Sequence, residues 1–137
     1  MAELSLTSSS VLRISGPAER RIQLGEAATG GMPLYKKAAD NRYYKAVNTS
    51  LEAANVTVIA AGDGAAGQYI SAIRPGTRYY HGASNATVGL VYYLGDAAGG
   101  IGVLIDVGTG KYVTTLFIAE SATIATFQPV VSGIVSA

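Results

Sequence analysis

The sequence predicts an all-β domain built of hairpins, and three observations lead to this prediction. Its 17 glycines divide the 137 residues into short segments. Those segments are rich in Thr, Val, Ile and Tyr, the residue types that pack well on a pleated sheet. No segment has the length and periodicity of a long helix. At this size a single domain, residues 1–137, buries about two-thirds of its unfolded surface.

Each predicted strand is an apolar or β-branched run between turn residues. In chain order these runs are Glu3 to Thr7, Arg20 to Leu24, Met32 to Lys36, Arg42 to Val47, Val56 to Ala61, Gln68 to Arg74, Val88 to Leu94, Ile101 to Asp106, Lys111 to Ala119, Thr123 to Gln128 and Val130 to Val135.

The strongest hairpin signal lies between Ile101 and Ala119. Gly108-Thr-Gly110 supplies residues that accept positive φ between two apolar arms, Val103 to Val107 and Tyr112 to Ile118. Alternation along the second arm places apolar groups on both of its faces. We therefore expect this hairpin to be covered on both sides within a larger assembly.

One segment has a helix-start signal. Thr49-Ser-Leu-Glu52 has the spacing of a capping box, but Asn55 and the β-branched run from Val56 end it within about two turns. We expect a short connector.

The stretch Val56 to Gly67, VTVIAAGDGAAG, matches the G-x-G-x-x-G pattern of dinucleotide sites. Such a site requires that the glycine turn open a helix. Only seven residues separate Gly67 from Pro75, and they include Tyr69, Ile70 and Ile73, which favour a strand. We therefore expect Gly62 to Gly67 to be a loop between two strands, without a nucleotide or other cofactor.

Charge is sparse in this chain. Ten Lys and Arg balance nine Asp and Glu, so the net charge of +1 gives no general attraction to nucleic acids or acidic membranes. Only 14% of the residues are charged and 49% are hydrophobic, whereas about 25% are charged in an average globular domain. This composition predicts that part of the surface is covered in an assembly. Neither a membrane span nor an export signal is recognisable, so we expect a soluble protein that is not exported.

The residue inventory predicts no catalytic or metal site. Cysteine is absent, His81 is the only histidine, and the acidic residues are scattered among turns. A metal site needs clustered ligands, and a serine hydrolase of the α/β type needs G-x-S-x-G, which is missing. We therefore expect a protein that is not an enzyme.

The segment Arg74 to His81 is the densest group of functional side chains. Arg78, Tyr79, Tyr80 and His81 are a candidate ligand cluster, since guanidinium, phenol and imidazole groups can stack on sugars or bases. The alternative is that Tyr79 and Tyr80 point to opposite faces of a strand, one into the core and one to the surface.

The N-terminal segment, residues 1–19, differs from the β core, residues 20–137. It alternates apolar and polar residues but has no nearby return strand, so it is either a free extended arm or an ordinary first strand. A free arm could add to the sheet of a partner, with Arg20 and Arg21 reaching carboxylates at the rim.

The order of these elements resembles the head decoration, or capsid cement, proteins of tailed bacteriophages. The segments that carry the resemblance are the Leu4-Ser-Leu-Thr start, Gly25 to Tyr35, Gly62 to Gly67, Val88 to Ile101, Gly110 to Thr114 and Val130 to Ala137. The match extends from about Leu24 to the end of the chain and is poorest over Ser8 to Glu19.

The resemblance implies a small β-barrel or β-tulip that forms a homotrimer. Such a trimer is made in the host cytoplasm, binds the outside of the virion and clamps major capsid protein subunits together. The residues expected to contact the capsid are Leu4, Leu6, Val11 and Arg13 of the N-terminal segment, together with Arg20 and Arg21. Nucleic acid and membranes are not expected as direct partners. The alternative function is a carbohydrate-binding β-module of a phage fibre that uses the cluster at Arg78 to His81.

Overall fold

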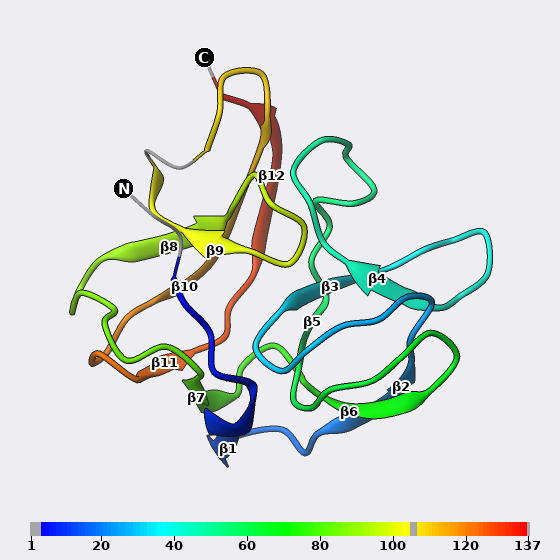
Figure 1. Cartoon of the computed structure of the whole chain (residues 1–137). Helices are drawn as coiled ribbons and strands as arrows, with labels where there is room; N and C mark the ends of the chain where they lie inside the picture. Colours follow the sequence, from blue (N-terminus) through cyan, green and yellow to red (C-terminus); the bar gives the residue numbers. More distant parts are fainter. Residues whose placement is uncertain (1–3, 105–106, 137) are drawn as a thin grey trace.

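The computed structural model describes residues 4–104 and 107–136 and shows an all-β protein, which confirms the predicted fold class. A short 3-10 helix, η1 (Ser8–Ser10), precedes the first strand. The described strands form three antiparallel sheets. Figure 1 shows two halves side by side, and the chain passes from the first half to the second and back.

Two of the sheets make up the first half. One has the order β1-β7-β11 and the other the order β12-β10-β8-β9. An antiparallel bridge between Ala119 and Ala125 joins them. The strands are β1 (Val11–Ser15), β7 (Arg78–His81), β8 (Val91–Leu94), β9 (Ile101–Gly102), β10 (Tyr112–Ile118), β11 (Ile124–Thr126) and β12 (Val130–Val135).

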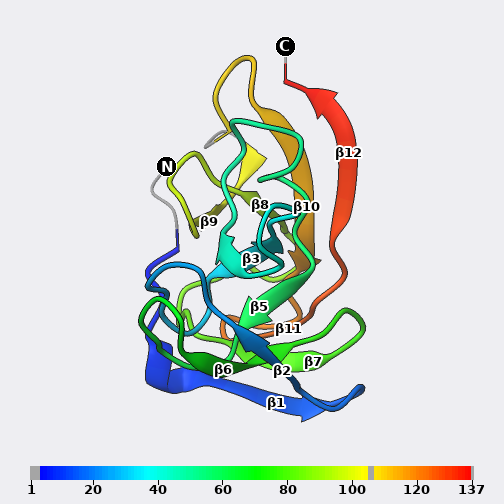
Figure 2. The same cartoon turned by 90° about the vertical axis from the view of Figure 1, so that its right-hand side faces the viewer.

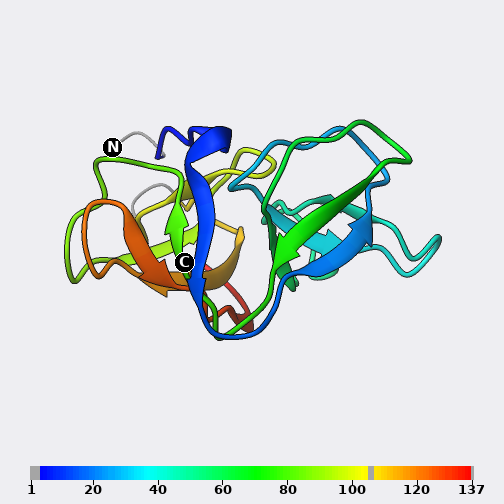
Figure 3. The same cartoon turned by 90° about the horizontal axis from the view of Figure 1, so that it is seen from below.

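The third sheet makes up the second half and has the order β2-β6-β5-β3-β4. Its strands are β2 (Arg20–Gln23), β3 (Pro33–Lys36), β4 (Tyr43–Lys45), β5 (Val58–Ala60) and β6 (Tyr69–Ile73). A parallel bridge between Leu24 and Tyr43, with the Gly25 N–H donating to the Tyr43 carbonyl at 2.8 Å, connects its first and last strands. The sheet therefore curls until its two edges meet, as the view from below shows (Figure 3).

Two hydrophobic cores lie on opposite sides of β5. The smaller core lies inside the curled sheet and includes Val58 and Ala60. Ile59, between them, belongs to the larger core, which also contains residues of the first half such as Phe117 and Phe127. Because successive side chains of a strand alternate between faces, this one strand serves both cores. The two halves are therefore one packed unit.

The chain passes between the two halves twice, and the two crossings, at Gly16 and Gly76, lie side by side; we call them the neck. β1 pairs with β7, so the whole of residues 16–77 leaves and returns between two adjacent strands. At the neck, Gly16 adopts a φ of +102°, and a Cβ there would lie 2.8 Å from the Gly76 carbonyl oxygen. Only glycine fits both this backbone conformation and this close approach.

The structure corrects two strand predictions and adds one strand. Leu4 to Thr7 form no strand, whereas Val11–Ser15, absent from the predicted set, forms β1. The predicted strand Ile101 to Asp106 is a strand only over Ile101–Gly102, and Ile105 and Asp106 lie outside the described residues.

The hairpin predicted between Ile101 and Ala119 is also wrong. β10 pairs with β8 and β12, and β9 pairs with β8. Gly108 and Gly110 indicate only that the chain turns there. Which strands β10 pairs with depends on its packing in the middle of its sheet, between β8 and β12.

The remaining connections agree with their predictions. Ser50 to Ala54 form a single turn, closed by the Ala54 N–H to the Ser50 carbonyl at 3.0 Å, as expected of a connector. The segment after the glycine-rich loop is strand β6, antiparallel to β5, as expected of a loop between two strands.

We expect Ile59→Ala to lower the free energy of unfolding by about 2–5 kcal/mol, because it opens a cavity in the wall that both halves share. Urea denaturation followed by tyrosine fluorescence and by circular dichroism measures this loss. Leu51→Ala is the matched control, since Leu51 is 51% exposed and its truncation should change stability by no more than about 0.5 kcal/mol. If fluorescence and circular dichroism showed separate transitions, the two halves would unfold independently, which would contradict a core shared by both.

Candidate interaction surface

The candidate ligand cluster on β7 is divided by the alternation of the strand. Tyr79 and His81 are fully buried, whereas Arg78 and Tyr80 are exposed. Burial raises the pKa of the Tyr79 phenol, and its ring packs edge-to-face on Phe117 and Phe127. The four side chains therefore do not form one binding surface. This is the arrangement of the alternative interpretation, in which neighbouring tyrosines face opposite ways.

His81 is a core residue in this structure. Its imidazole stacks on Phe117 with 5.2 Å between ring centroids, and Nδ1 accepts a hydrogen bond from the Ala83 N–H at 3.2 Å. Burial lowers the pKa of His81 to about 4, with the Ser121 backbone acting in the opposite direction. The side chain is therefore neutral near pH 7 and contributes packing.

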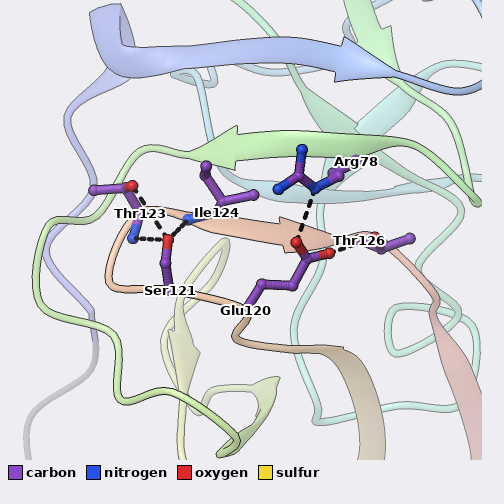
Figure 4. Close-up of polar contacts among 6 residues, drawn as sticks. All are labelled: Arg78, Glu120, Ser121, Thr123, Ile124 and Thr126. Atoms are coloured by element: carbon purple, nitrogen blue, oxygen red, sulfur yellow. Dashed lines mark hydrogen bonds and ion pairs between the residues drawn. The ribbon is translucent and has the colours of Figure 1, made fainter.

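Arg78 is held in an ion pair on the outer face of the β7 sheet. Its Nε lies 2.8 Å from Glu120 Oε2, and the Thr126 hydroxyl donates to the other carboxylate oxygen at 3.0 Å (Figure 4). The hydrogen bond from Arg78 holds the pKa of the Glu120 carboxyl below its usual range. Beside them, the Ser121 hydroxyl oxygen accepts the N–H groups of Thr123 and Ile124. This network ties β7 to β11 and to the turn before it.

Tyr80 is the one aromatic residue of the cluster that borders a groove. The groove has a volume of about 240 Å³ and is lined by Thr7, Ser10, Tyr80, Gly82, Ala83, Ser84 and Thr123. Hydroxyl groups beside an exposed ring are the chemistry that a sugar would use.

The glycine-rich loop has a structural role. Asp63 accepts hydrogen bonds from the Gly30 N–H at 2.9 Å and from the Ser8 hydroxyl at 3.2 Å, and Gly64 pairs with Ala28. The loop thus ties the N-terminal segment to the second half. Since strand β6 follows it, the loop opens no helix that could receive a phosphate.

From Leu4 on, the N-terminal segment packs against the rest of the molecule. Leu4 and Leu6 pack against the larger core, and the Leu4 N–H donates to the Ile101 carbonyl at 2.8 Å. Val11 is only 8% exposed. Of the two interpretations of this segment, the structure shows an ordinary first strand, β1, because Leu4, Leu6 and Val11 pack in the larger core.

The basic residues at this end differ in what they contact. Arg13 folds back on its own chain, where Nε donates to the Pro17 carbonyl at 2.9 Å and Nη2 to the Gly16 carbonyl. Arg20 and Arg21 are exposed on β2. Six residues are expected to contact a partner. Of these, Arg20 and Arg21 have exposed side chains that could bind one.

Several large apolar side chains of β12 are exposed to solvent. Val130, Ile134 and Val135 are 60%, 68% and 48% exposed, and Ile118 on the neighbouring β10 is 57% exposed. Ile118 and Val130 border a groove of about 280 Å³, which is also lined by Val91, Thr115, Phe117 and Gln128. No charged residue occurs from Ser121 to Ala137. We call the exposed side chains of β12 together with Ile118 the β12 surface.

Sequence reasoning predicted the strand Val130 to Val135 but missed its exposure. The paired apolar residues Val130-Val131 and Ile134-Val135 read as a buried strand, because period-2 alternation is lost. The signal that could have identified the surface is the 17-residue run without charge.

Among the described residues there is neither a cluster of metal-ligating side chains nor a membrane-spanning helix. No group of three His, Asp or Glu side chains within residues 4–104 and 107–136 could hold a metal ion. Within the same residues, no helix has the length and apolar character to cross a membrane.

Comparison of the sequence with known proteins finds no match, either to a protein-family model or to a curated protein.

Stability should fall as the pH falls from about 6.5 to about 4, because the unfolded chain takes up the His81 proton first. Above pH 6.5 the contribution of the buried neutral ring is fully present. By pH 4 about 3 kcal/mol is lost, and the loss from this group then levels off. Urea midpoints measured from pH 7.5 to pH 3.5 test this.

His81→Phe is the matched variant, since it keeps the stack on Phe117 but cannot titrate. Its stability should decline less steeply than that of the wild type between pH 6.5 and pH 4. Parallel curves for the two proteins would show that His81 is protonated as readily in the fold as outside it.

Proposed function

We propose that this chain is a structural protein that assembles with its own copies as a homotrimer and binds the outside of a tailed-phage capsid. In that position it stabilises the contacts between major capsid protein subunits. The observation that carries the proposal is the uncharged, solvent-exposed β12 surface.

A monomer gains nothing from such a surface, because exposed apolar area costs free energy and a bare strand edge promotes aggregation. Association of identical copies would remove both costs. The low charge of the whole chain agrees with an assembled protein, since the centre of a subunit interface is depleted of charge.

The assignment to a capsid exterior comes from the likeness in element order to phage head decoration proteins. Arg20 and Arg21 on β2 are the capsid-contact residues that the structure supports, because their side chains are exposed and no ion pair joins them to another described residue. Many weak contacts of this kind on one shell would add up through multivalency.

The groove beside Tyr80 favours the second candidate function, carbohydrate binding by a phage fibre module. In this alternative Tyr80 alone of the original cluster contacts the sugar. A glycan array on which Tyr80→Ala abolishes specific binding would support it, and Leu12→Ala, on the neighbouring strand, is the control.

We expect the purified protein to remain a trimer of the 14.0 kDa chain across a dilution series, measured by sedimentation or native mass spectrometry. Ile134→Lys places a charge on the β12 surface and should raise the dissociation constant of the trimer by tenfold or more, since burial of an unpaired charge costs at least about 1.4 kcal/mol. Leu51→Lys, at a similarly exposed apolar position, should leave the trimer unchanged. A stable wild-type monomer would contradict the proposal.

A further inference from the structure

The molecule covers most of the edges of its own sheets. β9 is an outer strand, but the Leu4 N–H donates to its Ile101 carbonyl. The outer strands β2 and β4 meet through the bridge from Leu24 to Tyr43, and β11 is joined to the end of β10 by the bridge from Ala119 to Ala125. Unpaired backbone at an edge is a template for another strand, so these contacts are protective.

Two edges stay open among the described residues. β12 pairs with β10 on one side only, and β1 pairs with β7 on one side only. Figure 2 shows both strands at the periphery, with β12 along one side of the molecule and β1 along the bottom. They are similar in length, with six residues in β12 and five in β1.

The side chains at both open edges are apolar. Leu12 on β1 is 61% exposed, comparable with Val130 and Ile134 on β12. The one charged residue of β1, Arg13, has its guanidinium turned back onto the Gly16 and Pro17 carbonyls. Neither edge therefore carries an outward charge of the kind that natural proteins use to prevent pairing.

We propose that β12 of one copy adds to β1 of the next copy, so that the chains join head to tail. This inference rests on the self-assembly proposed above and names the two surfaces that meet. Because the two edges are different strands, the contact is heterologous, and a heterologous contact that closes gives a ring. Pairing of β12 with its own counterpart would instead give a two-fold dimer, which cannot produce three equivalent subunits.

A second copy fits these edges better than an unrelated partner of charged surface. Backbone pairing satisfies the open N–H and C=O groups of β1 and of β12 outside its bulge, where the Ser132 hydroxyl already bonds to the Ile134 N–H and C=O. The contact of Leu12 with Val130 or Ile134 buries apolar area without desolvating a charge. Each copy carries one edge of each kind, so a closed ring leaves neither edge exposed.

The absence of cysteine makes the inference directly testable. Leu12→Cys is mixed in turn with Val130→Cys and with Ile134→Cys, so that either relative direction of the two strands brings one pair close. A short bis-maleimide is preferable to oxidation, because a disulfide requires Cβ atoms about 3.5–4.5 Å apart. Sedimentation first establishes that each single variant keeps the native mass of the wild type.

We expect one of the two mixtures to form a cross-linked pair at least about tenfold faster than a mixture of Leu12→Cys with Leu51→Cys, because docking raises the local concentration of the reacting groups. The corresponding double variant, with both cysteines in one chain, should yield a ladder that ends at three cross-linked chains.

One result would overturn the inference while leaving the proposed function intact: the wild type is a trimer, but both mixtures cross-link no faster than the control. If Ile134→Cys instead cross-links only to itself, β12 lies against β12 in a two-fold dimer, and both the head-to-tail contact and the homotrimer are contradicted. A wild-type protein that is monomeric would instead remove the proposed self-assembly, and the head-to-tail contact with it.

Discussion

The alternation of three side chains along β5 is the constraint on which the rest of the structure depends. Val58 and Ala60 fill the interior of the curled sheet, and Ile59 fills the space between that sheet and the first half of the molecule. A shift of one residue in the pairing of β5 with β6 would exchange these sets and leave both cores badly filled. The register of this strand therefore determines that the two halves pack as one unit.

The same period of two determines what the surface offers to other molecules. On β7 it takes Tyr79 and His81 away from the surface and leaves Arg78 to an ion pair with Glu120. On the first half, what remains for interaction is mainly apolar: the β12 surface, Leu12 and the ring of Tyr80. This half is thus better suited to recognise shape and strand edges than to recognise charge.

The sequence was sufficient to predict the fold class and most strands, because runs such as Val56 to Ala61 and Lys111 to Ala119 are rich in β-branched residues between glycines. It was insufficient for β1, where Val11 and Ile14 follow the serines of η1 and resemble a free segment. It was also insufficient for the partners of β10. A glycine turn is visible locally, whereas pairing with β8 depends on contacts between residues far apart in the chain. The exposure of β12 depends on its position at the end of a sheet, and its local signal is the charge-free run from Ser121 to Ala137.

The neck at Gly16 and Gly76 has a consequence for the order in which the chain folds. Val11 and His81 are partners in the sheet although residues 12–80 lie between them in the chain. Closing a long flexible loop costs entropy, so this pairing is less costly once the intervening segment is ordered. β3 to β6 pair among themselves at much shorter separations than that of Val11 and His81, and β2 then pairs with β6. These strands can therefore form first and bring the two ends of the neck together. We therefore expect the second half to nucleate folding and β1 to close onto β7 late, with the β1 edge available to another chain only after that step.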